Sequence, residues 1–177
     1  NMLQGNLQVI NCGDATILGN ATWEGSVVVE GADSGRNGFL GFQSRLVTQV
    51  THVLYVRDNH SLVASDLYNE QSEGILHLSG RAGQPAGRVV VTGGRSHVNE
   101  GLAPASVIEN YRGELFIGGK DFSDHRALGA PPQVIRQTGE APLDVTLFGC
   151  FFYGAKLMFE KQDTMRLFMI GSSRLTV

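Results

Sequence analysis

The sequence predicts an all-β chain in which short strands stack on one another in the successive turns of a solenoid. Short apolar runs bounded by Gly, Asn, Asp and Ser recur along its whole length, which is typical of strands and turns. No stretch repeats apolar residues at i, i+3, i+4 and i+7 over three helical turns. Glycine supplies 23 of the 177 residues, about twice the usual ~7%, and suits a chain with many tight bends.

Each apolar run of suitable length is expected to form one strand. In chain order the eleven expected strands are Leu7–Ile10, Val27–Val29, Phe39–Phe42, Val53–Val56, Ile75–Leu78, Val89–Val91, Leu115–Ile117, Val134–Ile135, Val145–Phe148, Leu157–Phe159 and Leu167–Ile170.

A glycine-bounded unit, Gly-x-φ-x-φ-x-Gly with φ apolar, repeats with similar chemistry. It occupies residues 25–31, 74–80, 87–93 and 113–119, with a weaker copy at 154–160. In each clear copy the two apolar residues face one side of the strand and the residue between them faces the other. Irregular repeats of short strands with glycine turns indicate a β-solenoid.

One pair of units aligns further, at a constant offset of 39 residues. Residues 70–74 match residues 109–113, so Glu70 falls on Glu109 and Gln71 on Asn110. Amide side chains stacked at such turns are expected to hydrogen-bond along the solenoid axis. The competing fold is an antiparallel sandwich, which usually carries Asn-Gly or Asp-Gly hairpin turns. Only Asn37-Gly38 fits that pattern, so the solenoid is favoured.

The length suits a single domain spanning residues 1–177. Segments rich in Gly, Pro or charge interrupt the strand pattern near 81–87, 95–105 and 119–132, and we expect loop insertions there. The chain begins and ends within strand-like patterns, which indicates a segment of a longer polypeptide.

Composition argues against several classes of partner. The net charge is −3 and no basic block is present, so no nucleic-acid partner is expected. No apolar run approaches the ~18–20 residues of a membrane-spanning helix, and no membrane partner is expected. Cys12 and Cys150 form no metal-binding motif, so both are expected to be buried thiols, although a disulfide between them stays open.

Residues 66–80 and 87–93 resemble coils of the right-handed parallel β-helix. The pectate-lyase-like superfamily, with its glucanase and phage tail-spike branches, has this texture, although no catalytic signature of a lyase or hydrolase family matches residue by residue. The resemblance implies polysaccharide as partner, secretion or display at the cell surface, and association with other chains or with the rest of a longer polypeptide.

Stacked turns bring equivalent residues of neighbouring strands to about 4.7–4.9 Å. Glu70 and Glu109 are therefore candidate catalytic carboxylates, close to the ~5–5.5 Å separation of a retaining glycosidase. The alternative is that both are solvated turn residues, or that Glu73 and Arg112 form a surface ion pair beside them.

The same alignment places His77 and Phe116 at one outward position, where they would form an aromatic face for a sugar ring. The alternative is that a loop or another chain covers them. Arg112 and His125 complete the candidate substrate-binding set. Arginine outnumbers lysine by 11 to 3, and its planar group suits acidic polysaccharide as well as intrachain ion pairs.

The densest polar cluster is Lys120–Arg126. Asp121 and Asp124, with His125, are candidate acid and base groups. They would also suit calcium, although two carboxylates are few for an ion that takes six to eight oxygens; no resident metal is assigned. The alternative is a solvated loop.

Two functions remain open from the sequence. The first is part of a polysaccharide lyase or glycoside hydrolase. The second is a non-catalytic structural or carbohydrate-binding solenoid segment that assembles with other chains.

Overall fold

The computed structural model describes residues 2–4, 7–10, 14–17, 22–24, 27–30, 39–43, 46–48, 52–65, 69–70, 74–95, 105–122, 133–153, 157–171 and 173–175. These residues form strands and connecting segments and no helix, so none of them belongs to a helix that could cross a bilayer. For these residues the all-β prediction is confirmed.

The described residues form twenty strands. They are β1 (Met2–Gln4), β2 (Leu7–Ile10), β3 (Asp14–Ile17), β4 (Thr22–Glu24), β5 (Val27–Glu30), β6 (Phe39–Gln43), β7 (Leu46–Thr48), β8 (His52–Arg57), β9 (Leu62–Ser65), β10 (Asn69–Glu70), β11 (Gly74–Ser79), β12 (Gly87–Thr92), β13 (Ala105–Glu109), β14 (Gly113–Gly118), β15 (Gln133–Thr138), β16 (Leu143–Phe148), β17 (Phe151–Tyr153), β18 (Leu157–Glu160), β19 (Met165–Ile170) and β20 (Ser173–Leu175). All eleven expected strands are among them.

Two seven-stranded sheets hold most of the strands. Sheet I has the order β18-β15-β13-β11-β8-β5-β2, and sheet II has the order β19-β16-β14-β12-β9-β6-β3. Two smaller sheets have the orders β1-β4-β7-β10 and β17-β20. Every strand pair in these sheets is parallel, which excludes the antiparallel sandwich.

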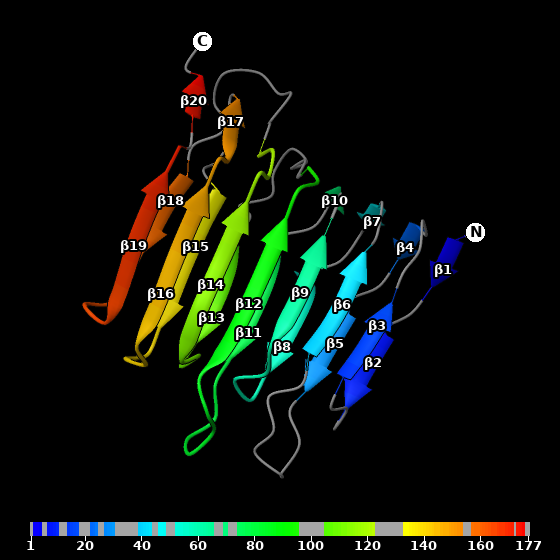
Figure 1. The fold of residues 1–177 in the computed structure, drawn as a ribbon, viewed down its shortest axis with the longest axis horizontal. Helices are drawn as coiled ribbons and strands as arrows, with labels where there is room; N and C mark the ends of the chain where they lie inside the picture. Colours follow the sequence, from blue (N-terminus) through cyan, green and yellow to red (C-terminus); the bar gives the residue numbers. More distant parts are fainter. Residues whose placement is uncertain are drawn as a thin grey trace.

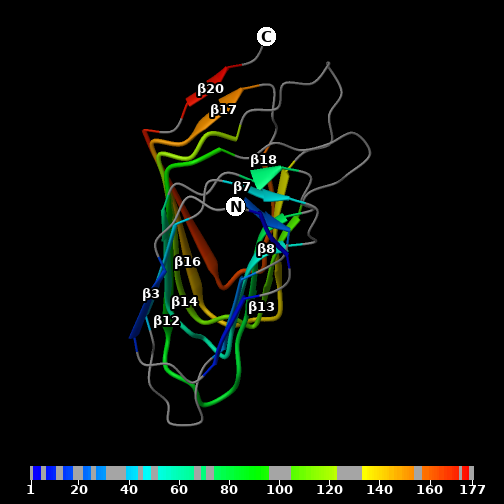
Figure 2. The same ribbon diagram turned by 90° about the vertical axis from the view of Figure 1, so that its right-hand side faces the viewer.

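The chain alternates between the two large sheets, adding one strand to each in turn. β11 of sheet I is followed by β12 of sheet II, β13 by β14, and β15 by β16. Figure 1 shows the strands of each sheet side by side, with β1 at one end and β20 at the other. In Figure 2 the two sheets form facing layers. We call one pass through sheet I and sheet II a lap.

The hydrophobic core lies between the two layers. Alternate residues of the strands face inward, as the burial of β9, β12 and β16 shows. The fully buried aliphatic side chains from both sheets include Leu54, Leu76 and Ile108 of sheet I and Leu62, Val89, Leu115 and Leu143 of sheet II. Burying a side chain of this kind contributes about 1.5–3 kcal/mol, so the alternating pattern stabilises the stack at every lap.

A polar corner joins the two sheets where β13 turns into β14. Residues 80–86, between β11 and β12, project beyond this corner, so the β13–β14 turn reaches the β8–β9 corner two laps away. The backbone N–H of Arg112 donates to Asn59 Oδ1 at 3.0 Å, and the hydroxyl of Tyr111 donates to the carbonyl oxygen of His60 at 2.7 Å. Asn59, His60 and Tyr111 are all buried. Of the two amides expected to stack, Asn110 lies at this corner and Gln71 lies outside the described residues.

Removing the Tyr111 hydroxyl is expected to weaken this corner. Burial, aided by the negative charge of Glu114, raises the pKa of Tyr111 above its ordinary value. The hydroxyl therefore stays protonated and serves as a hydrogen-bond donor. Tyr111→Phe leaves the buried carbonyl of His60 without this donor and should lower the free energy of unfolding by about 1–3 kcal/mol. Urea unfolding of the two proteins measures the difference, and equal midpoints would contradict it.

Candidate functional site

A row of charged side chains crosses the outer face of sheet II. Arg88 of β12 is in register with Glu114 of β14, Glu114 with Asp144 of β16, and Asp144 with Arg166 of β19. Each is the second residue of its strand, and the first and third are turned toward the core. Strand alternation therefore projects all four outward, where parallel pairing sets them side by side.

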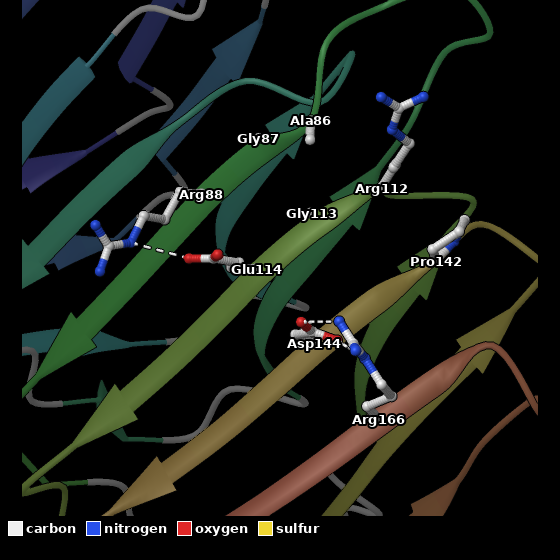
Figure 3. A pocket seen from close by; sticks show the side chains of 9 residues that line it. All are labelled: Ala86, Gly87, Arg88, Arg112, Gly113, Glu114, Pro142, Asp144 and Arg166. Atoms are coloured by element: carbon white, nitrogen blue, oxygen red, sulfur yellow. Dashed lines mark hydrogen bonds and ion pairs between the residues drawn. The ribbon is translucent and has the colours of Figure 1, made fainter.

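The charged row resolves into two ion pairs. Arg88 Nε lies 3.3 Å from Glu114 Oε2. Arg166 Nε donates to Asp144 Oδ1 at 2.6 Å, and its Nη2 donates to Asp144 Oδ2. These hydrogen bonds raise the pKa of Arg166 above its ordinary value. Figure 3 shows Glu114 directed toward Arg88 and Asp144 directed toward Arg166, so the two carboxylates point away from each other.

A shallow hollow of roughly 490 Å³ lies along this row. Small residues line one side of it, namely Ala86, Gly87, Gly113 and Pro142. Both glycines are required by packing: a Cβ on Gly113 would lie 1.9 Å from the carbonyl oxygen of Gly87, and one on Gly87 would lie 2.2 Å from the Tyr111 hydroxyl. Close packing of the corner thus leaves a recess beside the charged row, with Arg112 at its rim (Figure 3).

Aromatic side chains lie beside the charged row on the same face. Phe116 and Phe148 stack with ring centroids 6.3 Å apart and an interplanar angle of 25°. The Phe116 ring leans over Gly118, where a Cβ would lie 2.6 Å from the ring. Phe168, in the same row as Phe116, is 46% exposed, and Phe148 is 52% exposed. Together Phe116, Phe148 and Phe168 form what we call the aromatic strip.

The outer face of sheet I carries a second, smaller group. His77 Nε2 lies 3.4 Å from Glu109 Oε2, and the ring of Tyr55 meets the His77 ring edge-on at a centroid distance of 5.3 Å. Further along this sheet, Arg136 donates two hydrogen bonds to Glu160, which raise the pKa of Arg136 and lower the pKa of Glu160. The structure therefore brings together His77 and Glu109, two residues that the sequence analysis selected separately.

The expected pairing of Glu70 with Glu109 is wrong. Glu70 ends β10, which pairs with β7, whereas Glu109 ends β13, which pairs with β11 and β15. The offset of 39 residues aligns β11 of sheet I with β14 of sheet II, because the same glycine-bounded unit occurs in both sheets. An offset between different sheets does not make two strands neighbours. The structure therefore does not place these two glutamates on adjacent strands.

The expected side-by-side position of His77 and Phe116 is wrong for the same reason. His77 belongs to β11 of sheet I and is in register with Val107. Phe116 belongs to β14 of sheet II and is in register with Val90 and Thr146. Each aromatic ring nonetheless faces the outside of its own sheet, and Phe116 has Phe148 as its stacking partner.

The predicted polar cluster lies partly within the described residues. Asp121 Oδ2 lies 3.2 Å from Arg95 Nε, across a parallel bridge between the two residues. Asp124 and His125 lie outside the described residues, as do most of the expected insertions 95–105 and 119–132. Within the part of the chain that the structure describes, no three residues of the types His, Cys, Asp and Glu gather as metal ligands.

Lys120 opens this cluster and is fully buried, an uncommon position for a lysine. Burial lowers the pKa of Lys120 to about 7, against the opposing effect of nearby Cys150 and Asp121. Cys150 is also buried, as expected, and its Sγ donates to the carbonyl oxygen of Ile117 at 3.3 Å. Burial raises the pKa of the Cys150 thiol. Cys12 lies outside the described residues.

The sequence analysis missed the charged row, although its signal was present. Arg88 and Glu114 occupy the same position of the repeated unit, directly after its first glycine, and Asp144 and Arg166 follow the first residue of their strands. The four residues directly precede the expected strands 89–91, 115–117, 145–148 and 167–170, so comparing that one position among these four strands would have found two basic and two acidic side chains. Comparison of the chain with models of protein families, with curated proteins and with solved structures gave no match.

Proposed function

We propose that the chain is a segment of a parallel β-helix that binds an extended polysaccharide across the outer face of sheet II. The observation that carries the proposal is the charged row lying next to the aromatic strip on one outer face. The polysaccharide ligand implies that the protein acts outside the cell or at its surface, joined there to other chains or to further parts of a longer polypeptide.

A β-helix is a more specific architecture than a set of parallel sheets, because its chain winds in one direction around a common axis. Every strand pair is parallel, and successive laps add strands to sheet I and sheet II in the same order. These two observations support a chain that winds in one direction, as the resemblance to pectate-lyase-like coils implies.

The chemistry of the face suits a sugar chain. Aromatic rings offer apolar surfaces, and the C–H faces of sugar rings pack against such surfaces. The paired carboxylates and guanidinium groups keep unused hydrogen-bonding capacity, since a carboxylate accepts at about four lone-pair sites and arginine offers five N–H donors. Sugar hydroxyls donate and accept hydrogen bonds, so both classes of group on this face have a matching partner on one ligand.

Binding fits this face better than cleavage. Glycosidases usually need two carboxylates with distinct roles, one of them holding a proton near neutral pH. Glu114 and Asp144 are in register on adjacent strands, but each is engaged by an arginine on its far side. Each carboxylate is thus held in an ion pair and directed away from the other, not toward one glycosidic bond between them (Figure 3).

Truncating the aromatic strip is expected to weaken glycan binding. Phe168→Ala removes an exposed ring from the face, and loss of a sugar-stacking ring worth about 1–2 kcal/mol corresponds to roughly 5–30-fold weaker binding. A panel of neutral and acidic glycans, probed by affinity electrophoresis and calorimetry, measures the change.

Met169→Ala is the matched control. Met169 neighbours Phe168 on β19 and is 54% exposed, but it is in register with the buried Leu147 and therefore belongs to the opposite side of the sheet. Equal losses in the two variants, or no binding of any glycan by the unchanged chain, would contradict the proposal. Release of new chain ends from a bound glycan would instead establish cleavage.

A further inference from the structure

We propose that the corner beside this face holds a second subsite, which selects an anionic group on the bound glycan through Arg112. The inference rests on the proposed function and extends it by naming the ligand chemistry, a carboxylate or a sulfate ester on a sugar. The subsite is a hollow of roughly 360 Å³ between the β11–β12 connection and the turns that precede β14 and β16.

Arg112 lies at the junction of the two hollows. It lines the recess beside the charged row and also the corner hollow. Its backbone is fixed by the hydrogen bond to Asn59 Oδ1, while its side chain is exposed. In Figure 3 the guanidinium group points away from Glu114 and Asp144, toward the end of the sheet where the corner lies. A glycan leaving the charged row at this end would therefore meet Arg112.

The pattern of ion pairs singles out Arg112. On the outer faces and edges, four other arginines have acidic partners: Arg88 with Glu114, Arg95 with Asp121, Arg136 with Glu160 and Arg166 with Asp144. Among the residues that the structure describes, none forms an ion pair with Arg112. Its planar N–H groups are thus available to a bidentate anion, the geometry in which arginine binds carboxylates and related oxyanions.

The rest of the corner hollow is polar and nearly neutral. Besides Arg112, the charged residues of its lining are Arg81 and Glu140, whose charges are opposite, so the charge of Arg112 is the one that favours an anion. Asn110 and Gln84 add amide groups that suit sugar hydroxyls. The Asn110 side chain is held against the turn before β16, since its Oδ1 occupies the space where a Cβ on Gly139 would lie, 2.0 Å away.

Removing the Arg112 charge tests the subsite. The full chain is titrated by calorimetry with polygalacturonate, which carries carboxylates, with dextran sulfate, which carries sulfates, and with neutral dextran and galactan. Arg112→Gln should weaken binding of one or both anionic polymers about tenfold, the loss expected for one charge-assisted bidentate contact. Binding of the neutral polymers should not change, and raised salt should abolish the difference.

Arg57→Gln is the matched control, because Arg57 is exposed on sheet I and its replacement changes the net charge equally. The anionic polymer whose binding responds to Arg112→Gln identifies the group that the subsite takes. Equal losses in both variants, or glycan binding that Arg112→Gln leaves unchanged, would overturn the subsite while leaving the proposed function intact. Absence of binding to every polymer would overturn both.

Discussion

Replacing Gly113 with alanine is expected to destabilise the protein strongly. Gly113 opens β14 with a φ of +140°, a region that residues with a side chain rarely adopt. A Cβ would also lie 1.9 Å from the carbonyl oxygen of Gly87 on the adjacent strand, too close for any adjustment short of separating β12 from β14. Backbone strain of about 1–3 kcal/mol adds to this overlap, so we expect a loss of at least about 3 kcal/mol.

Gly119→Ala measures the cost of backbone strain without the steric overlap present at Gly113. Gly119 also has a positive φ, +60°, but no atom lies within 4 Å of the position a Cβ would take. Its replacement should therefore cost only about 1 kcal/mol, the strain of the left-handed conformation. Thermal and urea unfolding of both variants measure the two costs. Equal destabilisation by Gly113→Ala and Gly119→Ala would show that β12 and β14 do not pack this closely.

Stability is expected to rise with pH because of Lys120. Its folded-state pKa of about 7 is below the ordinary value of 10.5, so between these values the unfolded chain binds a proton that the folded chain does not. The free energy of unfolding should then increase as pH rises from about 7 to about 10.5. At about 1.36 kcal/mol per pKa unit, the full range corresponds to roughly 5 kcal/mol.

Lys120→Met should remove this dependence. Methionine keeps an unbranched apolar stem of similar length and carries no charge to bury, so the variant should be more stable than the unchanged chain below pH 7 by up to several kcal/mol. The two proteins should converge as the pH approaches about 10.5. Urea unfolding at a series of pH values measures the difference in free energy of unfolding between the two proteins. Titrating groups that both proteins share contribute equally to each and cancel in this difference.

Lys161→Met provides the comparison, since Lys161 is exposed in the β18–β19 connection. This variant should follow the pH profile of the unchanged chain. A constant difference between Lys120→Met and the unchanged chain across the whole series would contradict a depressed pKa at Lys120.

Local sequence was sufficient to find the longer strands and their inner faces. The unit at 87–93 became β12 and the unit at 113–119 became β14, because two apolar residues flanking an outward one determine which side is buried. Shorter or more polar strands, such as Leu46–Thr48 and Ala105–Glu109, were missed, because a strand of three to five residues carries little periodic signal.

The pairing of strands with one another could not be predicted from local sequence. The units at 74–80 and 113–119 look alike, yet the first belongs to sheet I and the second to sheet II. Which strands become neighbours depends on how many strands one lap contains and on connections such as residues 80–86. This is why Glu70 and Glu109 were assigned to one site, and why the His77–Glu109 contact was not foreseen.

In the candidate site, too, local sequence explains which side chains are exposed, and strand pairing explains which of them meet. Alternation along each strand places the four charged side chains on the outer face, because the residues on either side of each are turned toward the core; these are Arg88, Glu114, Asp144 and Arg166. Their arrangement as two ion pairs, with Arg112 left outside the row, follows only from the parallel pairing of four strands, whose paired residues are separated in the sequence by 22 to 30 positions.

The amino-acid sequence by itself indicated an all-β chain and which side of each longer strand is buried, because alternation of apolar residues is a local property; it favoured parallel stacking, and the strand pairing of the structure decided it. The tertiary structure alone decided which side chains meet across laps, since register depends on the summed packing of distant segments. The charged row, the aromatic strip and the buried amine of Lys120 are all products of that register.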